Sequence, residues 1–214
     1  MIPPEEGLRR LREGNRRFVA GEGRSALVTG HLRRSEVAGA QEPFAIVLGC
    51  SDSRVPAEIV FDQGLGDLFV IRVAGNIVAP SQIGSVEFAV ERFGTPLVVV
   101  LGHSQCGAIL ATVEHLARPR ETQSRNLLSI VDRVRPSVEA LLATELKQDP
   151  PALVSQAVRA NVRVSVDNLR QGSEILERHA ETGKLLVVGA EYSLESGVVE
   201  MFYGIPGGTS EPLN

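Results

Sequence analysis

The sequence contains only two cysteines, Cys50 and Cys106, and no tryptophan. It has no apolar run near the ~18 residues that a transmembrane helix requires. Its first residues, MIPPEEGLRRLREG, lack the apolar core of a secretory signal. We therefore expect a cytoplasmic protein with no membrane partner. Because thiols stay reduced in the cytoplasm, two cysteines there indicate metal binding or catalysis more than a disulfide.

An excess of positive charge is also absent. Lysine and arginine number 22 against 26 aspartates and glutamates, which gives a formal charge of −4. Nucleic acids and anionic membranes both favour a basic surface, so we expect neither as a partner. Arginines do gather between residues 9 and 17, but Glu5, Glu6 and Glu13 dilute them. We interpret this stretch as the solvated face of a helix.

The 214 residues are 43% hydrophobic, which suits a globular protein with one core. Short apolar runs typical of buried parallel strands occur at 44–49, 67–73, 96–102 and 184–190. Residues 197–204 follow after a short turn and could pair antiparallel at an edge. Helical patterns lie between these runs. The sequence therefore predicts an α/β fold: a parallel sheet of about four strands, an antiparallel edge strand and helices on both faces.

Several helix boundaries carry local signals. Ser81 is expected to cap a helix that Gly94 ends. Asp149, followed by proline, should start a long helix with a break at Gly172. Pro136 should break or kink the helical segment around it.

Each cysteine lies just after a predicted strand. Cys50 directly follows the strand at 44–49, in CSDSR, and Cys106 follows the strand at 96–102, in HSQCG. In open α/β sheets, ligand sites lie beyond the carboxyl ends of the strands, where the strand order reverses. If these two strands are neighbours at that point, both segments meet in one crevice.

Cys50, His103 and Cys106 are three ligands of the kind that zinc prefers. His103 and Cys106 are three residues apart, so both lie on one side of a single turn. Two thiolates and an imidazole favour zinc over magnesium or calcium, although cobalt or iron could substitute. The fourth position is left for water or for Asp52. A structural zinc and a chance pair of thiols are the alternatives, but structural sites usually use four Cys or His ligands.

Asp52 and Arg54 form a second layer beside these ligands. A guanidinium can donate two parallel hydrogen bonds to a carboxylate, so the two side chains can form a bidentate ion pair within one loop. The alternative is a surface ion pair that contributes little. Paired with Arg54, Asp52 would leave the metal open to water and orient the nucleophile, whereas a released Asp52 could bind the metal. We therefore predict that both residues are catalytic and that Asp52 is an alternative ligand.

A serine hydrolase is a competing interpretation. GHSQCG is close to a nucleophile elbow in which Ser104 would attack, and the remaining triad members in chain order would be Asp132 or Asp167 and then His179. However, Cys106 occupies the last glycine of that motif, where a side chain would crowd the strained turn.

A nucleotide-binding protein is the weaker alternative. The spacing from Gly102 to Gly107 is that of a phosphate-binding loop, but Ala108 stands where the lysine must be.

Two segments, CSDSRVPAEIVFDQGLGDLFVIRVAGN (50–76) and GHSQCGA (102–108), resemble the signatures of the β-class carbonic anhydrases. The resemblance extends from about residue 5 to residue 204 and rests on the paired Cys-x-Asp-x-Arg and His-x-x-Cys elements. It implies one zinc ion per chain, with three protein ligands at Cys50, His103 and Cys106. It also implies that Asp52 and Arg54 form the catalytic dyad.

The resemblance further implies a substrate pocket and a dimer. Gln41 matches a glutamine that hydrogen-bonds bicarbonate from the partner subunit. Phe69 and Ala74 match apolar walls of the pocket, and Gly107 matches a backbone donor beside the metal. Phe88 stands where one branch often has a tyrosine, so one polar contact is missing. The family's unit is a homodimer, sometimes assembled further, whose active sites lie at the interface and whose N-terminal helices pack across the partner.

Together these inferences predict a single domain overall, made of two segments. Residues 1–40 form an N-terminal helical arm that starts with an amphipathic helix at 5–20. Residues 41–214 form the α/β zinc catalytic domain. The implied function is the zinc-dependent reversible hydration of carbon dioxide to bicarbonate and a proton by zinc-bound hydroxide. Another linear heterocumulene, such as carbon disulfide or carbonyl sulfide, is the closest rival substrate.

One branch of the family has an inhibitory bicarbonate site built on a tryptophan. Val47 holds that position here, so we expect no such site even though Arg72 matches its arginine.

Overall fold

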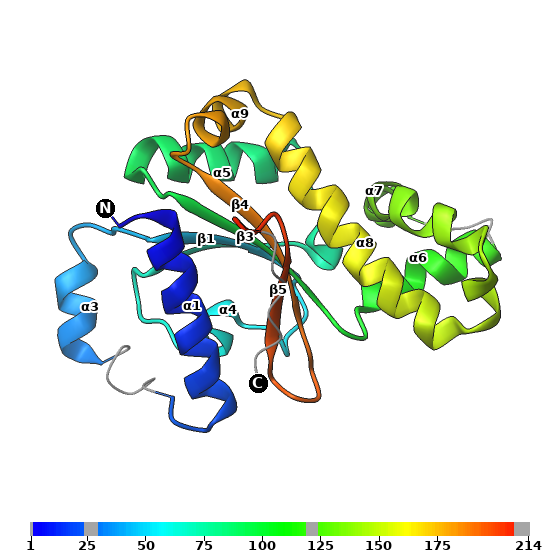
Figure 1. Ribbon diagram of the computed structural model, residues 1–214, viewed down its shortest axis with the longest axis horizontal. Helices are drawn as coiled ribbons and strands as arrows, with labels where there is room; N and C mark the ends of the chain where they lie inside the picture. The colour runs from blue at the N-terminus through cyan, green and yellow to red at the C-terminus, as the bar shows by residue number, and fades with distance from the viewer. Residues whose placement is uncertain (1, 24–29, 119–123, 208–214) are drawn as a thin grey trace.

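The computed structural model describes residues 2–23, 30–118 and 124–207. These residues form a five-stranded sheet with the order β2-β1-β3-β4-β5 (Figure 1). The first four strands in this order are parallel, and the edge strand β5 pairs antiparallel with β4. The strands are β1 (Ala45–Gly49), β2 (Leu68–Arg72), β3 (Leu97–His103), β4 (Leu186–Tyr192) and β5 (Val199–Tyr203). The predicted sheet and its antiparallel edge are therefore confirmed.

The central strands are buried on both faces, which explains their unbroken apolar sequences. In β3, Val99 and Leu101 face one hydrophobic cluster, whereas Val98 and Val100 face another. This alternation follows the two-residue period of a strand. The first cluster is closed by α1 (Pro4–Val19) and α4 (Ala57–Val60), and the second by α5 (Pro80–Phe93), α8 (Pro150–Gln171) and α9 (Glu174–Glu181). Helices cover both faces, as predicted.

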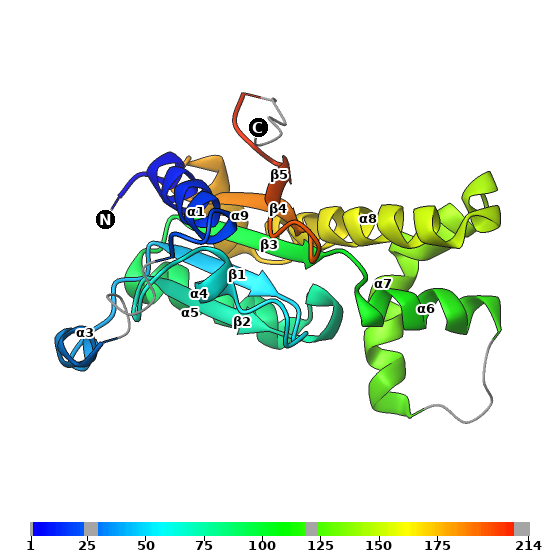
Figure 2. The ribbon, with the colours of Figure 1, turned by 90° about the horizontal axis from the view of Figure 1, so that it is seen from below.

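Two helices lie beyond the carboxyl end of β3 (Figure 2). They are α6 (Gly107–Ala117) and α7 (Arg125–Leu142), and they pack with α8 around a third cluster that contains Cys50 and Cys106. The other short elements are α3 (His31–Val37), the 3-10 turn η1 (Ala74–Asn76) and the 3-10 turn η2 (Glu145–Gln148). No helix among the described residues is long and apolar enough to cross a membrane.

Ser81 does not cap α5, and Pro136 does not break α7. Helix α5 begins at Pro80 after the cap residue Ala79, so Ser81 is inside its first turn and does not cap it. Proline is favoured in the first turn of a helix because its fixed φ matches the helical value. The N–H that proline lacks would have no acceptor within the helix at that position. Helix α7 also continues through Pro136 without a break. Pro136 is exposed, while Val134 and Val138 on either side of it are buried in the third cluster, and this packing holds the helix together.

The remaining boundary signals are confirmed. Gly94 ends α5 in the left-handed conformation, with φ 64°. Asp149 caps α8 by accepting a hydrogen bond from the backbone N–H of Ala152 at 3.1 Å. The chain breaks at Gly172 before α9, as expected. Helix α3 lies in the part of the N-terminal arm for which no separate helix was predicted, and residues 24–29 of that arm lie outside the described residues.

Helix α1 packs against the sheet of its own chain. Leu8 and Leu11 are buried in the first hydrophobic cluster. The buried side chain of Asn15 donates to the carbonyl oxygens of Val60 and Gly197 and accepts from the backbone N–H of Val199 at 2.9 Å. These bonds tie α1 to α4 and to the start of β5. In this chain the helix therefore completes the core, in addition to any contact that it makes with a partner.

The close approach of α1 to the segment after α4 gives a stability prediction. A Cβ atom on Gly14 would lie 1.8 Å from the carbonyl oxygen of Phe61, a backbone atom that cannot move aside. Gly14→Ala is therefore expected to lower the free energy of unfolding by at least about 3 kcal/mol, the upper end for overpacking. Gly84→Ala is the matched control, because Gly84 is exposed in α5 and nothing lies within 4 Å of its Cβ position. That change should stabilise by up to about 1 kcal/mol. Urea unfolding of both variants tests this, and equal stabilities would contradict the packing of α1 described here.

Candidate metal centre

Three buried side chains with metal-binding atoms meet at the carboxyl ends of β1 and β3. Cys50 directly follows β1, His103 is the last residue of β3 and Cys106 is the N-cap of α6. Their ligand atoms all lie within 4.8 Å of one another. Strand β1 is flanked by β2 on one side and β3 on the other, so the chain reverses its direction of winding here. The predicted meeting of the two segments at the switch point is therefore confirmed.

The turn between β3 and α6 orients His103. Gln105 adopts φ 57°, which lets the chain turn sharply and bring Cys106 back beside the imidazole. The Nδ1 atom of His103 lies 2.9 Å from the carbonyl oxygen of Ser104. A carbonyl can only accept a hydrogen bond, so Nδ1 carries the proton and Nε2 presents its lone pair. A metal-binding histidine is typically held in this way by a second group.

The donor atoms fit a metal ion. Nε2 of His103 is buried and has no hydrogen-bond partner among the described residues. A buried polar atom without a partner is costly, so its position beside two thiols indicates that it serves as a ligand. The proximity of the two thiols lowers the pKa of Cys50 and raises the pKa of Cys106, because a thiolate on Cys50 is stabilised by the neighbouring thiol and disfavours a second negative charge. One thiolate is thus readily available, and the thiolate is the form that binds metals.

Asp52 and Arg54 are paired beside these ligands. The guanidinium of Arg54 donates to both carboxylate oxygens of Asp52, at 2.9 and 2.7 Å, and the backbone N–H of Arg54 donates to one of them at 3.0 Å. These bonds hold the pKa of the Asp52 carboxyl well below its usual range. Oδ2 of Asp52 lies 4.0 Å from Nε2 of His103. The carboxylate is therefore ionised, fixed by Arg54 and next to the ligand set.

Arg72 secures the loop that carries Cys50 and Asp52. Located at the carboxyl end of β2, it donates to the carbonyl oxygen of Cys50 at 3.0 Å and to that of Asp52 at 2.6 Å. The sequence drew attention to Arg72 only as a counterpart of an inhibitory-site arginine. The signal for its structural role was weak: an arginine at the end of the strand that pairs with β1.

The expected substrate residues fall into two groups. Ala74 and Gly107 lie beside the ligands, because Ala74 begins the turn that contacts Cys50 and Gly107 follows Cys106 in α6. Phe69 on the edge strand β2 and Phe88 on α5 contact each other with tilted rings, whose centres are 6.2 Å apart. Phe88 is 53% exposed.

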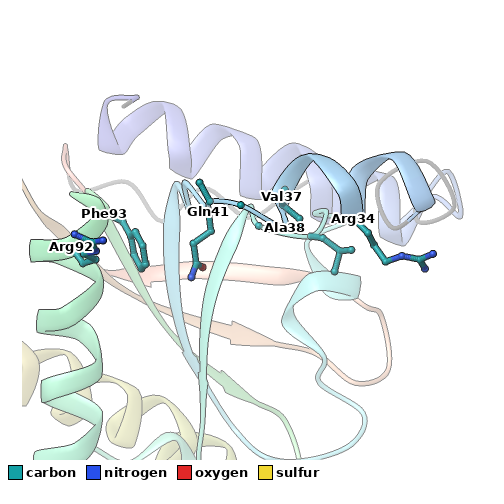
Figure 3. A pocket seen from close by; sticks show the side chains of 10 residues that line it. Arg34, Val37, Ala38, Gln41, Arg92 and Phe93 are labelled. Carbon is teal, nitrogen blue, oxygen red and sulfur yellow. The ribbon is translucent and has the colours of Figure 1, made fainter.

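Gln41 is separated from the ligands of its own chain. It precedes β1, whereas Cys50 follows that strand, so the two residues lie toward opposite ends of the sheet. Gln41 lines a pocket of about 760 Å³ (Figure 3), together with residues of α3 and the end of α5 that include Val37, Arg92 and Phe93. A single chain therefore does not bring Gln41, Phe69 or Phe88 to the metal-binding side chains.

The structure does not assemble the alternative sites. Ser104 accepts a hydrogen bond from the backbone N–H of Leu194 at 3.0 Å. The would-be triad base, His179, lines a pocket with Pro96, which precedes β3, whereas Ser104 follows that strand. The two acids are engaged elsewhere, Asp132 by Arg135 and Asp167 by the hydroxyl of Tyr203. The phosphate-loop alternative, already disfavoured by Ala108, gains no support, because Gly102 lies within β3.

An α/β sheet with a Cys-His-Cys set at its switch point defines a metal-binding enzyme fold of the doubly wound class. The family model described as carbonic anhydrase matches residues 45–199. The carbonic anhydrase of Mycolicibacterium smegmatis is 39% identical over 198 residues, which cover 92% of this chain and 93% of that protein. The chain belongs to the β-class carbonic anhydrases.

Solved structures agree with this assignment. The β-carbonic anhydrase CafA of Aspergillus fumigatus superposes with a TM-score of 0.68 at 28% identity, over 78% of each chain. A chain from the structures of two tetrameric β-carbonic anhydrases of the ascomycete Sordaria macrospora superposes with a TM-score of 0.68 at 25% identity. The match covers 78% of this chain and 84% of that one.

Proposed function

We propose that the protein catalyses the reversible hydration of carbon dioxide to bicarbonate and a proton, with one zinc ion per chain. The observation that carries this proposal is the convergence of Cys50, His103 and Cys106 beside an ionised, arginine-bound Asp52. Sγ of each cysteine and Nε2 of His103 would hold the metal. Two soft thiolates and an imidazole suit zinc better than magnesium or calcium. When bound, the zinc supplies Lewis-acid activation of water for addition to carbon dioxide.

Asp52 and Arg54 would position the nucleophile. Because Arg54 occupies both carboxylate oxygens, it keeps Asp52 ionised and turned toward the guanidinium. In that orientation Asp52 can accept a hydrogen bond from the attacking water and fix its direction. Release of Asp52 from Arg54 would free the carboxylate to take the fourth position on the metal, which would close the site.

Substrate binding would require a second copy of the chain. Ala74 and Gly107 lie beside the ligands, but Gln41, Phe69 and Phe88 lie elsewhere in the same chain. A homodimer, alone or within a larger assembly, would let the partner supply them. The partly buried edge strand β2 and the exposed ring of Phe88, which contacts Phe69 on that strand, support this arrangement, because exposed apolar side chains that lie together mark interfaces. Such an enzyme would act in the cytoplasm.

The dimer gives a second prediction. Phe88→Glu places a charge on the exposed aromatic surface and is expected to lower both the mass in sedimentation equilibrium and the rate of carbon dioxide hydration. Leu127→Glu is the matched control, because Leu127 is 55% exposed on α7, away from β2. It should leave both quantities at parental values. A Phe88→Glu protein with parental mass and parental rate would show that this surface is not the interface.

The decisive test of the function is stopped-flow hydration of carbon dioxide, with the zinc content measured on the same sample. About one zinc per chain with fast hydration supports the proposal. One zinc per chain without hydration, at neutral and alkaline pH, would instead favour another heterocumulene, a permanently closed metal or a structural zinc. A purified protein without zinc would overturn the proposal.

A further inference from the structure

A backbone N–H approaches one of the metal-binding sulfurs from the turn η1. The amide of Gly75 donates to Sγ of Cys50 at 3.4 Å in a buried contact. Gly75 adopts φ 72° and ψ 19°, and a Cβ there would lie 3.1 Å from Cβ of Ala108. Glycine is thus favoured both by the left-handed backbone and by the close packing against α6. The contact depends on how this turn is held in place.

Two buried polar side chains on α8 hold the turn. Nδ2 of Asn161 donates to the carbonyl oxygen of Gly75 at 2.8 Å, and Oγ of Ser165 donates to the carbonyl oxygen of Asn76 at 3.0 Å. Asn161 and Ser165 are 1% and 2% exposed and lie one helical turn apart on the same face. Buried polar groups of this kind require their partners, so the two bonds are strong constraints on η1.

We propose that Asn161 is a positioning residue of the metal centre: by holding the carbonyl group of Gly75, it fixes the backbone of that residue and keeps the Gly75 N–H, on the preceding peptide, directed at the sulfur of Cys50. This inference rests on the proposed metal binding. A hydrogen bond to a metal-bound thiolate withdraws electron density from the sulfur and weakens its donation to the metal. Two thiolates donate more charge than imidazoles do, so this bond would restore part of the Lewis acidity that the reaction needs. Ser165 supports the same turn one peptide further on and makes no bond to Gly75.

Cobalt(II) substitution tests this role through the sulfur-to-cobalt charge-transfer band. In Asn161→Ala, the loss of the hydrogen bond should raise the energy of the sulfur electrons and move the band to longer wavelength. Ser165→Ala is the matched control and should leave the band at its parental wavelength. An unchanged band in Asn161→Ala, or equal shifts in both variants, would overturn the proposal.

A measurement on the unaltered protein covers the case in which Asn161→Ala does not fold. In the protein loaded with ¹¹³Cd, the Gly75 amide proton should show a scalar coupling to the metal, transmitted through the hydrogen bond and Sγ of Cys50. A loaded, folded protein without that coupling would overturn the inference and leave the proposed function intact. A parent protein that binds neither zinc, cobalt nor cadmium would overturn the proposed function itself.

Discussion

Replacing Cys50 with serine is expected to abolish both zinc retention and carbon dioxide hydration. A serine hydroxyl is a hard, weakly acidic ligand, whereas zinc prefers the thiolate that Cys50 readily forms. Without the metal, the pKa of the attacking water rises far above the value near 7 that it has in carbonic anhydrases with three histidine ligands, so hydroxide is scarce at neutral pH. We therefore expect zinc content well below one per chain and a rate lower by at least about 10³-fold.

Ser51→Ala is the matched control for this loss. Ser51 is exposed, lies between Cys50 and Asp52 in the same loop, and is not expected to touch the metal. Its zinc content and rate should stay near those of the parent. Atomic absorption and stopped-flow assays on the two variants measure both quantities, with thermal unfolding to confirm that each variant is folded. Parental zinc content and rate in Cys50→Ser would refute the ligand assignment.

Replacing Asp52 with asparagine is expected to lower the turnover number by about 10²-fold or more while zinc content stays near one per chain. The neutral amide loses the ion pair with Arg54 and presents an N–H₂ group where the parent offers only acceptor oxygens. It would therefore orient the attacking water poorly. Because the pKa of Asp52 lies well below its usual range, the parent carboxylate is already ionised at neutral pH. The deficit should thus be similar at neutral and at alkaline pH.

Arg54→Lys separates the two halves of this pair. Lysine keeps the positive charge but cannot form the bidentate fork, so it should reduce turnover less than Asp52→Asn does. Ser53→Ala, between the two residues and exposed, should leave turnover unchanged. Measuring zinc content, turnover and its pH profile for all three variants tests the dyad. Parental turnover and pH dependence in Asp52→Asn would remove Asp52 from the mechanism.

Much of this architecture is encoded in local sequence. Strands such as β3 are buried on both faces, so their sequences are wholly apolar and are recognisable without any knowledge of their neighbours. The metal-binding side chains were found in the same way, because Cys50, His103 and Cys106 all come at or just after the end of an apolar strand. The sequence analysis required β1 to lie beside β3 as a condition, and the structure meets that condition.

Local signals failed where long-range packing competes with them. Pro136 predicts a break in a helix, but burial of Val134 and Val138 on both sides of it keeps α7 continuous. Helix α3 is short and has no buried residue, so no apolar periodicity marks it in the sequence. The continuity of α7 depends on packing against residues that are distant in the sequence, and α3 has no buried residue that would leave an apolar pattern. A window of neighbouring residues does not contain that information.

The sequence by itself determined the sheet, the candidate ligand set and the family, because apolar strands and the residues that end them are local patterns. Only the tertiary structure decided which atoms surround those ligands. Asn161 lies 86 residues from Gly75, and Arg72 lies 22 residues from the carbonyl group of Cys50 that it binds. The tertiary structure also placed Gln41 at the opposite end of β1 from Cys50. Hydrogen bonds and separations of this kind depend on how helices and strands pack in three dimensions, and no local periodicity records them.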